Sequence, residues 1–90
     1  MTRQVRTFVI VNTLGLHARA AAQLVQIANR FRSEVMVEKD GMEVNGKSIM
    51  GVLTLAAAKG SEIKVSVEGE DSEGAIGALA KLIEAGFGEK

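Results

Sequence analysis

The chain has 90 residues, 47% of them apolar and only three of them aromatic, all Phe. A chain of this length supports one hydrophobic core, so we expect a single domain over residues 1–90. Eleven basic residues balance eleven acidic ones. That balance argues against a binder of nucleic acid or anionic membranes, because such proteins carry excess positive charge. Since Tyr and Trp are absent, the usual platforms for base stacking are also missing. We therefore expect protein or small-molecule partners.

Cysteine is absent and histidine occurs once. A disulfide framework and thiolate chemistry are therefore excluded, and one histidine offers too few ligands for a structural zinc site. We expect neither a metal nor a cofactor. The first apolar run, residues 8–11, is far shorter than a membrane span or the apolar core of a signal peptide. The sequence thus predicts no membrane insertion and a cytoplasmic location.

The first half of the chain predicts a strand followed by a helix. Residues 5–11 are rich in β-branched and aromatic types and predict a strand, with apolar residues on both of its sides. Residues 12–15 have turn composition. From Leu16 onward the apolar residues recur at helical spacing. They are Ala20, Ala21, Leu24, Ile27, Ala28 and Phe31. The helix therefore begins at or beside His17.

The middle of the chain predicts a hairpin and a short helix. Val35 and Val37 alternate with polar residues before Asp40-Gly41, a dipeptide that is preferred in two-residue hairpin turns. A short antiparallel partner strand is expected over residues 42–45. Ser48 then stands at the N-cap position of an apolar helix over residues 49–55. We expect that helix to expose Ile49 and Met50.

The last third of the chain predicts one more strand and one more helix. Alternation over residues 63–67 indicates a strand, and a helix begins near Asp71 or Ser72 and ends before Gly86, a suitable C′ residue. The element order is βαββαβα. We expect an α+β open-faced sandwich in which a four-stranded antiparallel sheet is covered on one face by three helices.

His17 is the candidate reactive residue. The first amides of a helix have no internal partner, and the helix dipole adds roughly half a positive charge there, so a helix start binds phosphate. An imidazole nitrogen of His17 can attack phosphorus, while the amides of Ala18, Arg19 and Ala20 and the Arg19 guanidinium can hold phosphoryl oxygens. The alternatives are that His17 is a surface or capping residue and Arg19 a solvated helix residue.

Ser48 also has two interpretations. As an N-cap it satisfies an orphan amide and contributes about 1 kcal/mol relative to alanine. As a phosphorylation site it would place nearly two negative charges beside Ile49 and Met50. That charge would disrupt an apolar docking surface, if those two side chains form one. Their alternative role is ordinary half-buried packing.

Two segments resemble the HPr family of bacterial phosphotransferase-system phosphocarriers. They are residues 15–21, which read GLHARAA, and residues 47–52, which read KSIMGV. The resemblance spans nearly the whole chain and implies the open-faced sandwich. It also implies that His17 accepts a phosphoryl group through Nδ1 from enzyme I, which phosphoenolpyruvate phosphorylates. His17 would then pass the group to an enzyme IIA domain, with Arg19 steadying it. Such a protein is a transfer intermediate and not an enzyme.

The same resemblance implies a regulatory site and a docking surface. Ser48 would be phosphorylated by the ATP-dependent HPr kinase/phosphorylase. The surface that contacts partners would include Leu16, Ile49, Met50 and Leu53. A monomer is expected, because a small apolar patch suits transient docking. Both a sugar-transport branch and a nitrogen-related branch of the family stay open.

One position departs from the family pattern. The family usually has proline one residue after the arginine, and here that residue is Ala20. Alanine is a good helix former and restores an amide donor, so we expect the helix to form with a less rigid phosphate site. This departure favours a second hypothesis, a regulatory binding module that acts through phospho-Ser48. A third hypothesis, a sandwich that binds a ligand or nucleic acid, is disfavoured by the neutral charge and the lack of Tyr and Trp.

Overall fold

A computed structural model describes residues 2–89 and contains four strands, three α-helices and a short 3-10 turn. In chain order they are β1 (Arg3–Val9), α1 (Ala18–Ala28), β2 (Glu34–Lys39), β3 (Met42–Asn45), α2 (Ile49–Thr54), β4 (Glu62–Glu68), α3 (Ser72–Glu84) and η1 (Gly86–Gly88). The predicted order and the Asp40-Gly41 hairpin are confirmed. Among the helices of residues 2–89, none combines the length and the apolar composition that a membrane span requires.

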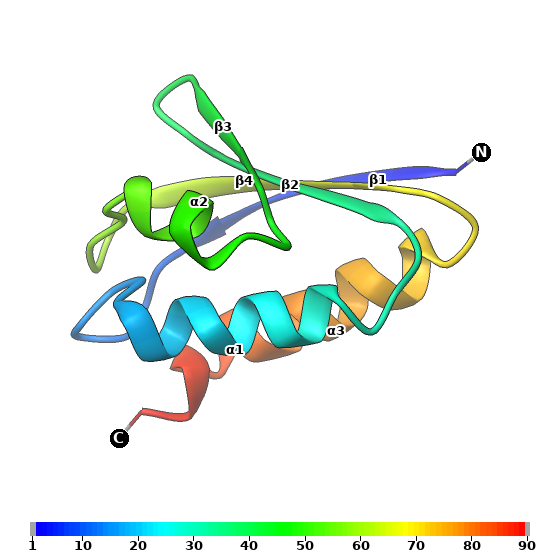
Figure 1. Cartoon of the computed structure of the whole chain (residues 1–90). Helices are drawn as coiled ribbons and strands as arrows, with labels where there is room; N and C mark the ends of the chain where they lie inside the picture. The colour runs from blue at the N-terminus through cyan, green and yellow to red at the C-terminus, as the bar shows by residue number, and fades with distance from the viewer. Residues whose placement is uncertain (1, 90) are drawn as a thin grey trace.

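The four strands form one antiparallel sheet in the order β1-β4-β2-β3. Figure 1 shows α1, α2 and α3 on one side of this sheet and the other side open. The fold is therefore the predicted open-faced sandwich. The core lies between the sheet and the helices, where Val35 pairs with Val67 and Val37 with Val65. All four valines are at most 1% exposed.

Strand β1 presents one side to this core and the other to the open face. Phe8 is buried, whereas Val5 and Val9 are 47% and 48% exposed. The sequence pattern had apolar residues on both sides of this strand and did not indicate the buried side. The strand also begins earlier than residues 5–11 predicted, at Arg3, and ends at Val9. Arg6 lies with its guanidinium carbon 4.8 Å from the Phe8 ring centroid, at the edge of the core.

Helix α1 ends at Ala28, three residues before Phe31, which is the last of the apolar residues that recur at helical spacing. Its C-cap is Asn29, whose backbone amide and side-chain amide both donate to the Val25 carbonyl, at 2.9 and 3.0 Å. Phe31 still packs partly buried against the core from the following turn. The apolar spacing extends beyond the end of the helix because Phe31 packs against the core from the turn that follows.

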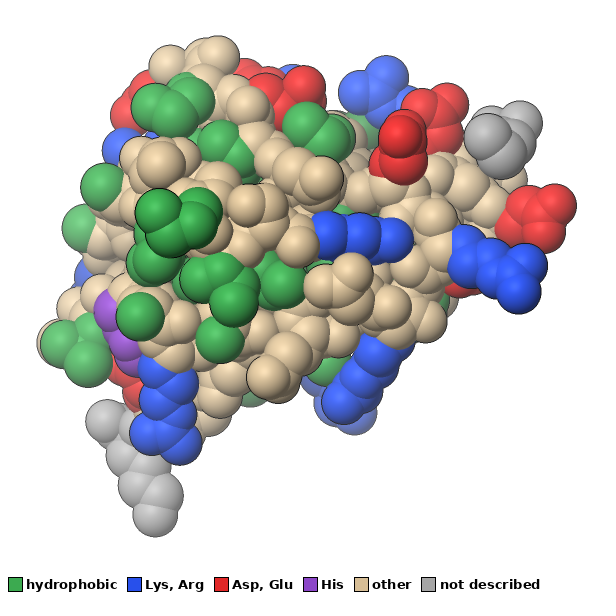
Figure 2. All heavy atoms as spheres, viewed as in Figure 1, with side chains coloured by type: hydrophobic (Ala, Val, Ile, Leu, Met, Phe, Trp, Pro, Cys, Tyr) green, Lys and Arg blue, Asp and Glu red, His purple; other side chains and the backbone are tan. Residues whose placement is uncertain are grey.

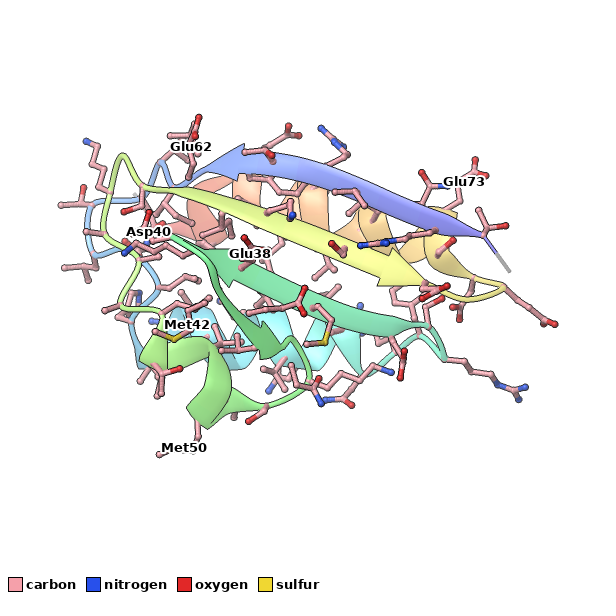
Figure 3. All side chains as sticks on the ribbon, turned by 90° about the horizontal axis from the view of Figure 1, so that it is seen from above. Glu38, Asp40, Met42, Met50, Glu62 and Glu73 are labelled. Carbon is pink, nitrogen blue, oxygen red and sulfur yellow. The ribbon has the colours of Figure 1, made fainter. Side chains whose placement is uncertain are left out.

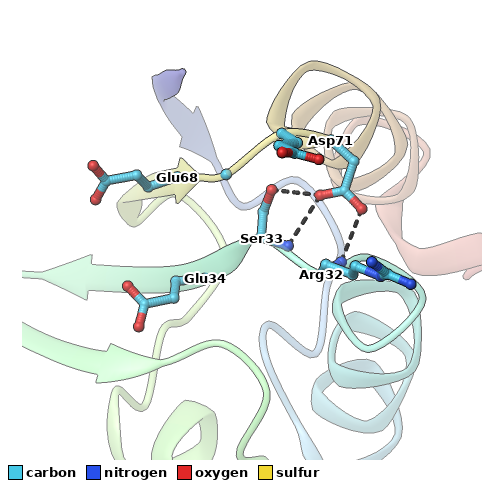
Figure 4. Close-up of a pocket in the computed structure, with 7 residues that line it drawn as sticks. Arg32, Ser33, Glu34, Glu68 and Asp71 are labelled. Carbon is cyan, nitrogen blue, oxygen red and sulfur yellow. Dashed lines mark hydrogen bonds between the residues drawn. The ribbon is translucent and has the colours of Figure 1, made fainter. Parts of the chain in front are cut away.

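The turn after α1 is tied to the start of α3 by Asp71. Its carboxylate accepts hydrogen bonds from the Arg32 amide at 2.8 Å, the Ser33 amide at 3.0 Å and the Ser33 hydroxyl at 2.5 Å. Figure 4 shows these contacts. The Ser33 hydroxyl, followed by the Arg32 amide, lowers the pKa of Asp71 below its ordinary value of 3.8. Asp71 thus fastens one end of α1 to α3.

A second turn sets the opposite end of α1. The Gly15 amide donates to the Asn12 carbonyl at 3.2 Å, and the Leu16 amide donates to the Ala57 carbonyl at 2.8 Å. Gly15 has a φ of +67°, and a Cβ there would collide with the Ala57 carbonyl oxygen. Glycine is required at this position for both reasons. This turn delivers the chain to His17 and the start of α1.

We predict that Asp71→Asn destabilises the protein at neutral pH. A carboxylate with a lowered pKa in the folded state contributes stability above its unfolded pKa and loses it as the pH falls through the folded pKa. The gap between wild type and variant should therefore be full near pH 7 and close below the ordinary value of 3.8. Urea unfolding across that range measures it. Asp40→Asn, on the exposed hairpin, is the control. A gap independent of pH would contradict the assignment.

We predict that Gly15→Ala lowers the free energy of unfolding by about 2 kcal/mol or more. Left-handed backbone costs alanine about 1 kcal/mol, and relief of the Ala57 collision breaks a hydrogen bond worth about 1 kcal/mol. Gly60→Ala is the matched control, because Gly60 has a φ of +90° and a Cβ added there would meet nothing within 4 Å. Equal losses for the two variants in chemical denaturation would show that the close approach to Ala57 does not matter.

Candidate functional site

His17 is the N-cap of α1, as predicted. Its backbone is extended, with φ −73° and ψ 177°, and its side chain makes no capping hydrogen bond. The first helical bond runs from the Ala21 amide to the His17 carbonyl at 2.8 Å. The amides of residues 18–20 therefore lack intrahelical acceptors. No acidic residue occurs in the first turn of α1, so its own helix does not neutralise the positive dipole end.

The imidazole of His17 contacts the carboxylate of Glu89. The His17 Nε2 lies 2.5 Å from the Glu89 Oε2, and the two side chains are 27% and 24% exposed. The same carboxylate oxygen accepts a hydrogen bond from the Asn12 Nδ2 at 2.9 Å. The hydrogen bond to His17, and secondarily the one to Asn12, lowers the pKa of Glu89. A ring nitrogen of His17 is therefore held by a carboxylate that is ionised at neutral pH.

A hollow of about 430 Å³ opens beside this pair. It is lined by residues from the turn before α1, the first turns of α1 and the segment that follows α3. They are Leu14, His17, Arg19, Gln23, Phe87, Gly88 and Glu89. Figure 2 shows the histidine at the surface, between hydrophobic side chains and a basic one. A partly exposed imidazole, free helix amides and a guanidinium can together accept and hold an anionic group such as a phosphoryl.

Ser48 has the predicted capping geometry at the start of α2. Its hydroxyl accepts a hydrogen bond from the Gly51 amide at 3.1 Å. Ile49 and Met50 project from α2 with 43% and 73% of their surfaces exposed. Leu53 is partly buried against the core. The α2 side chains that sequence reasoning singled out thus form an apolar projection beside a capped helix start.

Leu16 does not belong to the exposed surface, and its prediction as a contact residue is wrong. It is only 4% exposed, because the left-handed turn at Gly15 directs it into the core and its amide is bonded to Ala57. Leu14 is exposed instead, at 67%, and lines the hollow beside His17. Met42 is 50% exposed and lies toward the same end of the molecule as Met50 (Figure 3).

Two further site residues escaped sequence reasoning. Asn12 was assigned only to a turn, and Glu89 was not singled out at all. The two are 77 positions apart in the sequence, so no local spacing could relate them. Beyond Gly86, which adopts the predicted left-handed C′ conformation, the η1 turn buries Phe87 at 3% exposure with a φ of +56°. This unpredicted turn carries Glu89 back to the start of α1.

Comparison with known proteins relates this geometry to one family. Residues 4–85 match the family described as PTS HPr component phosphorylation site. The phosphocarrier protein HPr of Neisseria meningitidis is 52% identical over 80 residues, which cover 89% of this chain and 90% of that protein. The fold also matches the crystal structure of HPr-C-His from Thermoanaerobacter tengcongensis, with a TM-score of 0.93 and 50% identity over 97% and 98% of the two chains.

A third relative is the Bacillus subtilis catabolite repression protein Crh, crystallised as a dimer with a swapped domain. It is 46% identical, with a TM-score of 0.73 over 93% of this chain and 94% of its own. The family match and these relatives extend over most of the sequence, including both segments that resembled HPr. The chain therefore belongs to the HPr family of phosphocarriers of the bacterial phosphotransferase system.

Proposed function

We propose that His17 accepts a phosphoryl group on Nδ1 from phosphorylated enzyme I and passes it to an enzyme IIA domain, in the cytoplasm. The placement of His17 carries this proposal. The residue is partly exposed at the dipole end of α1, and its Nε2 is occupied by Glu89. Within residues 2–89, Nδ1 takes part in no hydrogen bond. It is therefore the ring nitrogen available for reaction.

The transfer needs only groups at this helix end. The lone pair of Nδ1 attacks phosphorus, a bond forms between them, and the bond from phosphorus to the donor breaks with its electron pair leaving on the donor. The amides of Ala18, Arg19 and Ala20, together with the Arg19 guanidinium, donate to the phosphoryl oxygens. In the next transfer, a nucleophile of the acceptor bonds to phosphorus, and the bond from phosphorus to Nδ1 breaks with its electron pair returning to Nδ1.

Ala20 is compatible with this role. It is fully buried in the first turn of α1, and the helix forms without the proline that the family usually has there. As the third residue of the helix, its amide has no intrahelical acceptor. Alanine thus keeps a backbone donor in the first turn of α1 that proline would lack.

The exposed apolar side chains near His17 supply a surface on which partners can dock. We call Leu14, Ile49 and Met50 the docking face. Each is at least 43% exposed, and large exposed apolar groups of this kind mark interaction sites. Enzyme I, enzyme IIA domains and the HPr kinase/phosphorylase are the proposed partners. A docking face of three side chains is small for a permanent interface, so it suits transient docking of a monomeric protein.

Regulation through Ser48 is the second candidate function. Two observations favour it: the similarity to Crh, whose name refers to catabolite repression, and the position of Ser48 next to the docking face. A phosphate on its hydroxyl would sit at the positive end of α2 while adding charge beside Ile49 and Met50. This role can coexist with phosphoryl transfer, or replace it if His17 does not react.

We predict that enzyme I and phosphoenolpyruvate add one acid-labile phosphate to the wild type and none to His17→Ala. Intact mass and phosphorus NMR measure the product. Gln26→Ala, an exposed change on the same helix, is the control and should react like the wild type. An unreactive wild type in the presence of a competent enzyme I would refute the carrier role and favour the Ser48 regulatory module. Phosphate that persists on His17→Ala would place the acceptor elsewhere.

We predict that Ser48→Asp weakens binding to enzyme I about tenfold, equivalent to about 1.4 kcal/mol. Aspartate keeps an N-cap acceptor, so α2 should persist, but it adds charge beside the docking face. Ser48→Asn is the matched control, because asparagine caps equally well without charge. Calorimetry measures the affinities and thermal unfolding checks the fold. If both variants bind alike, charge at Ser48 does not control docking.

A further inference from the structure

We propose that Glu89, held in place by Asn12, is a positioning residue that fixes the proton of His17 on Nε2 and leaves the lone pair on Nδ1. The inference rests on the proposed function of His17 and adds a residue to it. The carboxylate comes from the segment after α3, whereas the imidazole stands at the start of α1. Their contact therefore joins two parts of the chain that are 72 positions apart.

The protonation pattern follows from hydrogen-bond chemistry. Neutral imidazole has one nitrogen that donates and one that accepts, and an ionised carboxylate only accepts. With the Glu89 Oε2 at 2.5 Å from Nε2, the proton belongs on Nε2, because the other tautomer would oppose two lone pairs. Nδ1 is then the nucleophilic nitrogen. The resemblance to HPr implied the same atom, and here the choice follows from the contact itself.

The carboxylate of Glu89 is held in place by a second hydrogen bond, from Asn12. Asn12 is 5% exposed, and its Nδ2 donates both to the Gly15 carbonyl at 2.7 Å and to the Glu89 Oε2 at 2.9 Å. Both hydrogens of that amide group are therefore used, one on the turn and one on the carboxylate. The buried Phe87 anchors the segment that carries Glu89. Glu89 is thus linked to the same turn that delivers His17.

This arrangement distinguishes the His17–Glu89 pair from an ordinary surface ion pair. The side chains of Arg6 and Glu84 are 48% and 62% exposed and 3.4 Å apart, a geometry that contributes little. His17 and Glu89 are only 27% and 24% exposed and closer together. Partial burial and a second donor on the carboxylate make the orientation of the imidazole ring specific.

Glu89 also compensates the charge that appears during transfer. When Nδ1 bonds to phosphorus while Nε2 keeps its proton, the ring becomes a cation, and the carboxylate lies directly against it. When the phosphoryl group leaves, the electron pair of the bond from phosphorus to nitrogen returns to Nδ1 and the ring is neutral again. The proton stays on Nε2 throughout. Neither transfer then requires a base to remove it. Glu89 would orient His17 in the way that a buried Asp orients the His of a catalytic triad.

The positioning role is tested on the unphosphorylated protein with Glu89→Gln. Glutamine offers both a donor and an acceptor, so it no longer selects one tautomer. Nitrogen-15 NMR of the imidazole at a pH where it is neutral should show the Nε2–H form dominating in the wild type. In the variant, the ratio should move toward that of a peptide of residues 14–20. Glu43→Gln, which removes the same charge from exposed β3, should leave the ratio unchanged. An identical ratio in Glu89→Gln and the wild type would overturn the proposal.

The role in transfer is tested separately by rapid-quench phosphorylation with enzyme I. We expect Glu89→Gln to accept phosphate about tenfold more slowly than the wild type, as for loss of a hydrogen bond to a charged group. Glu43→Gln should match the wild type. A shifted tautomer with an unchanged rate would overturn the catalytic consequence of the contact. A wild type that accepts no phosphate would refute the proposed function, while the tautomer ratio would still test the positioning of His17 by Glu89.

Discussion

The packing of α1 and α3 against one face of the sheet constrains every other part of the molecule. The valines of β2 and β4 beneath these helices are at most 1% exposed, and burial of such a side chain contributes roughly 1.5 to 3 kcal/mol. A capping hydrogen bond contributes about 1 kcal/mol. The core therefore determines where α1 lies, and the polar contacts at its ends adjust its surroundings without displacing it.

The two ends of α1 differ in whether a carboxylate accepts hydrogen bonds from the backbone amides beside them. At its C-terminal end, the amides of Arg32 and Ser33 in the following turn are satisfied by the carboxylate of Asp71. At its N-terminal end, the first turn contains no acidic residue that could neutralise the free amides. The carboxylate of Glu89, which lies beside His17, bonds to the imidazole and to Asn12. The positive end of α1 thus has no carboxylate in its own first turn, an arrangement that suits the anionic group of the proposed function.

The site combines segments that the core alone brings together. The turn over residues 12–17 supplies Asn12, Leu14 and His17, and the η1 turn supplies the buried Phe87 and, after it, Glu89. The docking face adds Ile49 and Met50 from α2, which contacts α1. The proposed phosphoryl acceptor, the group proposed to orient it and the proposed docking face therefore lie on one part of the molecule. The turn over residues 12–17 contributes to all three of them, and α2 and the segment after α3 supply the rest.

The sequence by itself determined the order of the four strands and three α-helices, the Asp40-Gly41 hairpin, the Ser48 cap and the position of His17 at a helix start. Periodicity, turn residues and capping are local, so they can be read within a few positions. Only the tertiary structure decided that Leu16 is buried while Leu14 is exposed, because the left-handed turn at Gly15 sets the direction of both. It also decided which side of β1 faces the core and that Glu89 meets His17. A contact across 72 positions leaves no periodic trace in the sequence, because it exists only after the core has closed.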